Sequence, residues 1–269
     1  MRQFLDQIAC HSIMWGGHRV VEAMAEVAPL AYRGIEIFDP SRIPGGLGNL
    51  PNLLKKYGLQ ISGFYFAAGF VDEEDAETEW ATFEQYVRNV SPVGAEYLVL
   101  GAGYSEKPPS AEDFDHLFET ITRAGEFCAA HGMKVAVHPH YGLRIYKEKE
   151  IDLLCERTPP GTVFLALDTA HLALAGSNPV EVLRKHRDRV VYIHLKDLEG
   201  ETFVELGEGN ANIDFAGFLS ELDAMGYKGW LTVEQDSTRR DTRESAEISM
   251  KFLKGLINRL ADDKGEPRT

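Results

Sequence analysis

The chain alternates eight times between a short run rich in β-branched and aromatic residues and a longer amphipathic stretch. Parallel strands need a crossover connection of about a dozen or more residues, and an amphipathic helix commonly supplies it. Eight such units favour an α/β fold that closes into one (β/α)₈ barrel rather than an open sheet. The predicted strands are Gln7–Ile13, Gly34–Phe38, Gln60–Phe66, Tyr97–Leu100, Lys134–His138, Val163–Leu167, Val190–Leu195 and Trp230–Glu234.

Helical patterns fill the intervals between these strands. One of them carries Trp80, Phe83 and Val87 at spacings of three and four, which predicts a core-facing stripe. A barrel of this kind takes about 250 residues, so we expect residues 1–269 to form a single domain. The polar segment Asp262–Thr269 is expected to fray. The predicted helices are Arg19–Ala28, Leu50–Tyr57, Glu73–Val90, Ser110–His131, Lys147–Arg157, Pro179–His186, Phe215–Met225 and Arg243–Leu260.

The charge balance excludes some classes of partner. The chain has 42 Asp and Glu against 28 Lys and Arg, a formal net charge of −14, which repels the phosphates of nucleic acids. No apolar run approaches the roughly 18 residues of a membrane-spanning helix, so we expect no membrane partner. The first residues contain no apolar signal segment, and the three cysteines are widely spaced. We therefore expect reduced thiols and a cytoplasmic protein.

Side chains that can bind metals or move protons gather where the predicted strands end. These carboxyl ends form the active-site face of a (β/α)₈ barrel. Six of the nine histidines lie at a strand end or shortly after one, whereas chance would scatter them over helices and loops. The residues in question are Cys10, His11, His18, Glu36, Asp39, His138, His140, Asp168, His171, His194, Lys196, Asp197, Glu234 and Asp236.

Four of these residues, from four consecutive strands, form a candidate metal site. Imidazole and carboxylate ligands suit Mn²⁺, Co²⁺, Fe²⁺ or Zn²⁺, and the lack of thiolates argues against a structural zinc site. The predicted ligands are His138, Asp168, His194 and Glu234. His140 lies two residues after His138 and would point to the same side of a continuing strand. One of the two could then bind the ion while the other acts on the substrate.

The chain contains HPHYG (138–142), LALDTAH (165–171), VYIHLKD (191–197), LGEGNANIDF (206–215) and GYKGWLTVEQD (226–236). These segments resemble the xylose isomerase-like TIM barrels, a superfamily of sugar isomerases and epimerases. Within it they are most similar to inosose dehydratases, which act on keto-inositols. The resemblance extends from about residue 95 to 255 and continues more loosely through RGIEIF (33–38). The motifs are specific for the superfamily and only moderately specific for the reaction.

The resemblance implies a metal role for three residues and a branch within the family. Asp168, His194 and Glu234 match the family's metal ligands. The fourth ligand is a glutamate in the epimerase branch, and His138 holds that place here. This departure weakens a proton shuttle between two glutamates and favours the dehydratase-like branch, whose fifth strand also ends in a His-x-His pattern.

The resemblance also implies contacts to the substrate. His171 and Lys196 match positions that face it, and Glu36 matches a carboxylate near the pocket. Lys196 could hold an enolate or a hydroxyl group, or it could simply pair with Asp197. We also assign His11, at the end of the first strand, to the substrate-binding set.

One divalent ion would support enediolate chemistry on a keto-polyol or ketosugar. We expect Mn²⁺ or Co²⁺ first, with Zn²⁺, Fe²⁺ or Mg²⁺ as alternatives. The ion would act as a Lewis acid on a carbonyl and its neighbouring hydroxyl. The predicted general base is His140 or Glu234. Loss of a hydroxyl would dehydrate an inosose-like substrate, whereas return of the proton elsewhere would isomerise or epimerise a sugar or sugar phosphate.

Each of several further residues near the strand ends could have either a substrate-binding or a structural role. Trp15 and Phe66 could pack on the apolar face of a sugar ring or belong to the core. Glu208 could bind a polyol hydroxyl or lie in a flexible loop. Arg239 and Arg240 follow the last strand, where barrels often bind phosphate, and offer weak support for a phosphorylated substrate.

Two functions from other classes are weighed against this hypothesis. Some barrels of the same superfamily are metal-dependent DNA repair endonucleases, but the acidic charge and the shortage of extra ligands argue against that activity. A non-catalytic sugar-binding barrel would not need the additional histidines. Barrels of this type are commonly oligomers, so a homo-oligomer is one expectation, although the sequence shows no interface.

Overall fold

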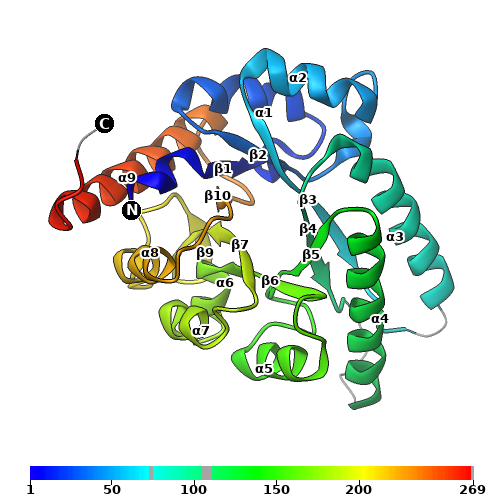
Figure 1. The fold of residues 1–269 in the computed structure, drawn as a ribbon. Coiled ribbons are helices and arrows are strands. Elements are labelled where there is room, and N and C mark those ends of the chain that lie inside the picture. Colours follow the sequence, from blue (N-terminus) through cyan, green and yellow to red (C-terminus); the bar gives the residue numbers. More distant parts are fainter. Residues whose placement is uncertain (73–74, 105–110, 268–269) are drawn as a thin grey trace.

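Eight parallel strands close into a barrel in a computed structural model that describes residues 1–72, 75–104 and 111–267. The strands follow one another around the barrel in the order β1, β10, β7, β6, β5, β4, β3, β2, with the helices outside (Figure 1). The predicted (β/α)₈ fold is therefore confirmed. The barrel strands are β1 (Ile8–His11), β2 (Gly34–Ile37), β3 (Gln60–Ala68), β4 (Tyr97–Ala102), β5 (Lys134–Val137), β6 (Val163–Asp168), β7 (Val190–Leu195) and β10 (Leu231–Val233).

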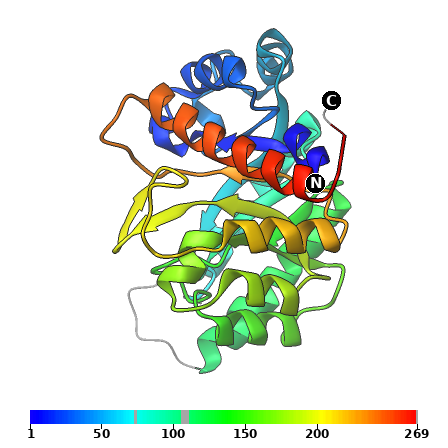
Figure 2. The ribbon, with the colours of Figure 1, turned by 90° about the vertical axis from the view of Figure 1, so that its left-hand side faces the viewer.

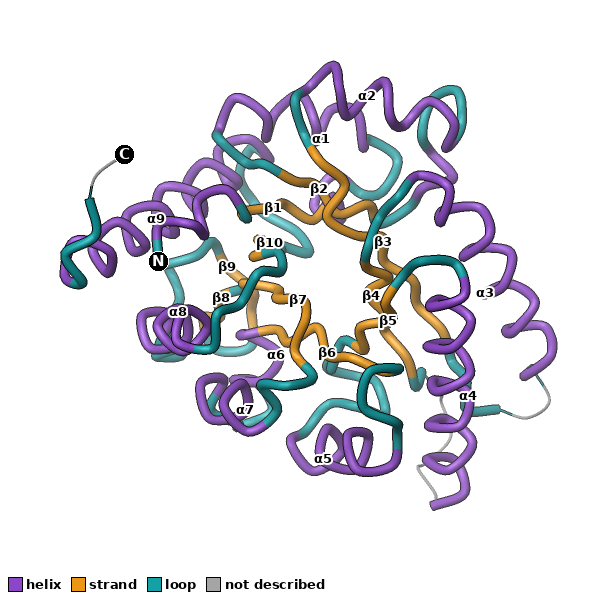
Figure 3. Tube along the Cα trace, in the orientation of Figure 1, coloured by secondary structure: helices purple, strands orange, loops and turns teal. Residues whose placement is uncertain are grey.

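Helices form a ring around the strands, as Figure 3 shows. Eight of them correspond to predicted helices; Ser110, Glu73 and Glu74, which were predicted to begin two of these, lie outside the described residues. No helix in the described part of the chain is long and apolar enough to span a membrane. The helices are α1 (Val20–Val27), α2 (Leu50–Tyr57), α3 (Ala76–Val90), α4 (Ala111–Ala130), α5 (Glu148–Arg157), α6 (Thr169–Leu174), α7 (Pro179–Lys185), α8 (Phe215–Ala224) and α9 (Thr242–Asp263).

Alternation along the strands divides the apolar side chains between two cores. Leu98 and Leu100 of β4 belong to the large core between strands and helices, together with the predicted stripe of α3. Val99, between them, belongs to a smaller core of alternate strand residues. Parallel strands need apolar residues on both faces, because helices cover one face and the barrel interior the other. The smaller core consists of Tyr97, Val99, Ala136, Ala166 and Tyr192.

Two short elements follow barrel strands without being predicted. The six-residue α6 begins directly after β6, and Asp168 caps it by accepting hydrogen bonds from two backbone N–H groups. Strands β8 (Asp197–Glu199) and β9 (Thr202–Val204) form an antiparallel hairpin after β7. Segments of three to six residues are too short for a hydrophobic period to show.

The last helix is longer than predicted and its end lies near the start of the chain. α9 continues through Asp263, three residues beyond the predicted end of the helix. The amino group of Met1 lies 2.7 Å from Oδ1 of Asp223 and 2.9 Å from Oε1 of Glu266, so the start of the chain binds the segment after α9. Figure 2 shows these two parts of the chain side by side. Glu266, in the segment that was predicted to fray, therefore contacts the start of the chain.

Two helical glycines provide a matched test of the packing. A Cβ atom on Gly125 in α4 would lie 2.5 Å from the backbone oxygen of Thr162, so Gly125→Ala should lower the free energy of unfolding by roughly 1–3 kcal/mol. A Cβ on Gly255 in α9 would meet only Nη1 of Arg259, at 3.6 Å. Gly255→Ala should therefore raise stability by about 0.4–1 kcal/mol. Urea unfolding measures both changes, and equal effects would contradict the close approach at Gly125.

Candidate functional site

Strand order and register bring the predicted strand-end residues together at one end of the barrel. β7 lies between β6 and β10, and β1 lies between β10 and β2. Asp168 of β6 pairs in register with His194 of β7, and His11 of β1 pairs with Glu36 of β2. Glu234 follows β10 directly. Side chains of paired residues point to the same face of a sheet, so all five project to the barrel interior.

The four predicted ligands form a buried group that could hold a metal ion. One ligand atom from each lies within 4.8 Å of the others. Nε2 of His138 and Oδ2 of Asp168 have no hydrogen-bond partner, although buried polar atoms in proteins are nearly always satisfied, and Nδ1 of His194 lies 2.7 Å from Oε2 of Glu234. A cation among these atoms would satisfy all of them at once. The atoms are His138 Nε2, Asp168 Oδ2, His194 Nδ1 and Glu234 Oε2.

The two histidines of this group are each oriented through the second ring nitrogen. Nδ1 of His138 donates to the backbone oxygen of Ala166 at 3.3 Å. Nε2 of His194 donates to Oε2 of Glu36 at 2.8 Å. Metal-binding histidines almost always have such a partner, which fixes the tautomer and the ring orientation. The arrangement leaves Nε2 of His138 and Nδ1 of His194 for an ion.

Glu36 and His11 were predicted to contact the substrate, but the structure gives them almost no exposed surface. Nε2 of His11 lies 3.6 Å from Oε1 of Glu36, and its Nδ1 lies 3.8 Å from Oε1 of Glu234. That same Nδ1 accepts a hydrogen bond from the N–H of Ile13 at 3.2 Å. Both side chains therefore contact candidate ligand residues within the barrel.

The two carboxylate oxygens of Asp168 have different surroundings. Oδ1 accepts the N–H groups of Ala170 and His171 at 2.8 Å each, and so caps α6. Oδ2 has no hydrogen-bond partner, and Nζ of Lys196 lies 3.9 Å from it. Burial raises the pKa of Asp168 from 3.8 to about 6, although Lys196 acts in the opposite direction. The position of this ligand is thus fixed by backbone atoms.

Lys196 is fully buried among acidic side chains. Its Nζ lies 2.8 Å from Asp236 Oδ1 and 3.4 Å from Glu234 Oε2, in addition to the contact with Asp168. The ring of Phe203 from β9 covers it, with the centroid 4.5 Å from Nζ. Burial alone would lower the pKa of Lys196, but the three carboxylates raise it. The ammonium group is therefore retained inside the protein.

His194 and Glu234 shift each other's pKa toward the charged forms. Burial alone would lower the pKa of His194, but Glu234 and Glu36 raise it well above its usual value. Burial alone would raise the pKa of Glu234, but Lys196 and His194 hold it well below its usual value. Nδ1 of His194 lies 2.7 Å from Oε2 of Glu234. An ion that binds these two atoms must therefore displace a proton from the imidazole.

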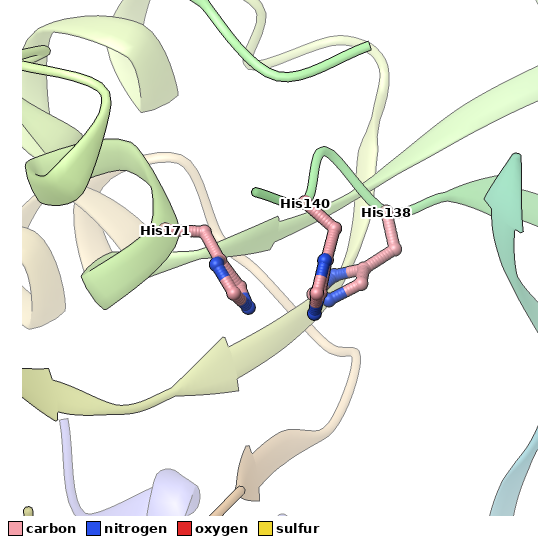
Figure 4. Close-up of side chains that lie close together, drawn as sticks. All are labelled: His138, His140 and His171. Carbon is pink, nitrogen blue, oxygen red and sulfur yellow. The ribbon is translucent and has the colours of Figure 1, made fainter. Parts of the chain in front are cut away.

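Three histidines at the mouth of the barrel lie side by side (Figure 4). The ring centroids of His140 and His171 are 3.9 Å apart, and His138 lies 5.4 Å from the former and 5.5 Å from the latter. Burial lowers the pKa of all three, and Lys196 helps to lower that of His171 to about 2. These rings are therefore neutral bases near the candidate ligands.

Trp15 and Phe66 were each predicted either to contact a sugar ring or to belong to the core. In the structure both pack in the core. Trp15 is fully buried, and its Nε1 donates to Oε2 of Glu26 at 2.9 Å. Phe66 on β3 packs against Phe83 and Tyr86 of α3, with ring centroids 5.5 and 4.8 Å apart. Its side chain points outward, because successive residues of a strand face opposite sides.

Tyr65, the residue before Phe66, occupies the position near the strand ends that was one expectation for Phe66. Tyr65 points into the barrel and meets the rings of His11 and His138 edge-on, while Phe38 stacks on it at 5.7 Å. Strict alternation along β3, counted from a buried outward-facing residue, could have identified it. Asp236, which binds Lys196, belonged to the strand-end set but had no predicted role.

Glu208 and the two arginines after β10 lie outside this cluster. Nη1 of Arg240 lies 2.5 Å from Oε2 of Glu208 and 2.8 Å from Oε2 of Glu205. Both Arg239 and Arg240 are exposed. Because two carboxylates neutralise Arg240, the structure adds no support for a phosphate site there.

Comparisons with known proteins agree with the fold. A family model described as xylose isomerase-like TIM barrel matches residues 24–256. An inosose dehydratase of Geobacillus kaustophilus (strain HTA426) is 28% identical over an alignment of 277 positions, gaps included, that covers 90% of this chain and 88% of that protein. The solved structure of the IOLI protein with a zinc atom superposes with a TM-score of 0.82 at 18% identity, covering 94% and 99% of the two chains. That of L-ribulose 3-epimerase has a TM-score of 0.80 at 17% identity, covering 96% of each.

Asp168 makes the stability of the metal-free protein depend on pH. Because its pKa is raised in the folded chain, its contribution to the free energy of unfolding is full below pH 3.8 and is lost as the pH rises through about 6. Between pH 5.0 and 7.5 the parent chain should therefore lose about 1 kcal/mol relative to Asp168→Asn. Asn keeps the acceptor that caps α6, so the fold is preserved. Urea unfolding in EDTA measures this difference, and a constant difference across the range would contradict the raised pKa.

Proposed function

This chain belongs to the xylose isomerase-like TIM barrel family, and we propose that it is a divalent-metal-dependent enzyme acting on a keto-polyol or ketosugar. The proposed reaction is dehydration of an inosose-like substrate through an enediolate. Relatives named inosose dehydratase that align with about nine-tenths of the chain support this choice. So does His138, which replaces the glutamate expected of an epimerase.

The observation that carries the proposal is the convergence of four buried atoms of the kinds that bind metals. Two imidazole nitrogens and two carboxylate oxygens suit Mn²⁺ or Co²⁺, with Zn²⁺, Fe²⁺ or Mg²⁺ as alternatives. When bound, such an ion supplies a Lewis acid for a carbonyl and its neighbouring hydroxyl and stabilises a developing oxyanion. It would also replace the proton on His194 as the partner of Glu234.

His140 is the better placed of the two candidate bases. Its Nδ1 lies 2.6 Å from the backbone oxygen of Tyr141, which can only accept, so the lone pair is on Nε2. Glu234 is engaged by His194 and Lys196, which makes it a weak base. His140 would remove the proton next to the carbonyl and then deliver it to the departing hydroxyl, which leaves as water.

Lys196 and His171 would hold the substrate during this transfer. Nζ of Lys196 keeps its charge and lies 3.5 Å from Nε2 of His171, so the two can share one substrate oxygen. Phe203 covers Lys196 and makes ring contact with His171, at a centroid distance of 5.0 Å. This ring would keep water away from the ammonium group, which strengthens its attraction to an oxyanion.

Isomerisation or epimerisation of a sugar or sugar phosphate is the second candidate function. The similarity of the fold to L-ribulose 3-epimerase favours it, and the same residues could serve it if the proton returned to carbon. The engagement of Arg240 by two glutamates argues for a substrate without phosphate.

A substrate and metal experiment tests the proposal. The purified protein should bind one divalent ion per chain, and incubation with 2-keto-myo-inositol should produce the ultraviolet absorbance of an enedione. Removal of the ion with EDTA should abolish turnover. Asp168→Asn and His194→Ala should each weaken binding of the ion by at least about tenfold. Epimerisation of free ketohexoses without the new absorbance would select the second candidate, and full metal binding by both variants would refute the site.

Glu36→Gln tests the support of His194 separately from the ligands. Loss of the carboxylate that accepts from Nε2 should weaken Mn²⁺ binding by about 10–100-fold, because partners of this kind orient the ligand and raise its basicity. Titration calorimetry measures the affinity. Glu150→Gln, at a buried carboxylate that caps α5, is the control and should leave it unchanged. Equal affinities for parent and Glu36→Gln would contradict the role.

A further inference from the structure

We propose that His138, His140 and His171 form a second, all-nitrogen position for a divalent ion, and that this position and the four-ligand position exclude each other. One ligand atom from each histidine lies within 4.8 Å of the others. His138 and His171 are 1% exposed, whereas His140 faces the mouth of the barrel and is partly exposed. The loop after β5 supplies two of the rings, and the first turn of α6 supplies the third (Figure 4).

Backbone atoms turn the same nitrogen of each ring toward the shared space. Nδ1 of His138 faces the carbonyl of Ala166, and Nδ1 of His140 faces that of Tyr141, so both carry protons and leave Nε2 as the ligand atom. Nδ1 of His171 accepts from the N–H of Tyr141 at 3.4 Å. An ion on Nε2 of His171 would require the proton to move to Nδ1, at the expense of that long hydrogen bond.

Exclusion follows from His138, because one lone pair cannot serve two ions. Its Nε2 is the atom without a partner, and both positions need it. The type of ion then selects the position. Ligands that include carboxylates suit Mn²⁺ and Mg²⁺, whereas imidazole ligands alone suit Cu²⁺, Ni²⁺ and Zn²⁺.

Lys196 opposes an ion at the three histidines, since its Nζ lies 3.5 Å from Nε2 of His171. Asp236 lies 2.8 Å from this ammonium group, Glu234 lies 3.4 Å away and Asp168 lies 3.9 Å away. When the four-ligand position is empty, these carboxylates keep their negative charge and offset both cations. The exchange of position therefore leaves the local charge balanced.

Occupation of the second position would inhibit the enzyme. It would engage His140 and His171, the groups proposed to move the proton and hold the substrate. This consequence rests on the proposed function, whereas the binding itself does not. An enzyme loaded with Mn²⁺ would thus be blocked by Cu²⁺ in the same pocket rather than activated by it.

Paramagnetic resonance of the full chain with Cu²⁺ or Mn²⁺ tests the two positions. Bound Cu²⁺ should show coupling to three imidazole nitrogens, and its addition to the Mn²⁺-loaded chain should release Mn²⁺ one for one. His140→Gln should weaken the binding of Cu²⁺ by at least about tenfold and leave that of Mn²⁺ within about twofold, whereas Asp168→Asn should weaken the binding of Mn²⁺ far more than that of Cu²⁺. His138→Gln should weaken the binding of both Cu²⁺ and Mn²⁺. His131→Gln, in the turn after α4, is the control and should change neither.

Three results would overturn the inference. His140→Gln and Asp168→Asn could weaken the two ions in equal proportion, which would show a single position. Cu²⁺ and Mn²⁺ could bind the same chain together, which would remove the exclusion. Cu²⁺ could bind the parent and His140→Gln equally, which would place it elsewhere. Failure of Mn²⁺ alone to bind would instead count against the proposed function, because the nitrogen coupling of Cu²⁺ does not depend on it.

Discussion

Mutual compensation of buried charge is the interaction on which this end of the barrel depends. Glu36, Asp168 and Glu234 are removed from water and would be strongly destabilising if unpaired. Lys196 and His194, whose pKa the neighbouring glutamates raise, lie among them and offer the opposite charge. The two basic side chains therefore offset much, but not all, of the charge of the three buried carboxylates.

The geometry of the barrel makes this cluster unavoidable. Closure of a parallel sheet brings the carboxyl ends of all eight strands to one mouth, and the register sets Asp168 beside His194 and His11 beside Glu36. Helices outside the strands provide most of the apolar burial. The interior layer next to the site can then be polar: Thr232 donates to the hydroxyl of Tyr192, which donates to Ser62. The apolar residues that stabilise the fold thus lie mainly between strands and helices, whereas the polar residues near the candidate site lie inside the barrel.

The barrel and the ligand group could be predicted because both leave long or repeated patterns. Eight alternations determine the fold class, and a polar residue after an apolar strand marks the mouth. Which side of a strand a single residue faces is harder to predict, because an error of one position moves Phe66 to the place of Tyr65. The support role of Glu36 depends on contact with His194, 158 residues away, which no local pattern contains. The hairpin that carries Phe203 is too short to produce a period.

Asp168 joins the cap of α6 to the candidate ligands through one carboxylate, and this restricts which residues can replace it. Glutamate would extend the reach by a methylene group and could not keep both the helix start and the ligand atom where they are. Asparagine preserves the helix but lacks the charge, and alanine loses both. Since α6 also carries His171, any substitution that shifts the cap would move that histidine as well. The single side chain of Asp168 therefore ties the position of His171 to that of the candidate ligands.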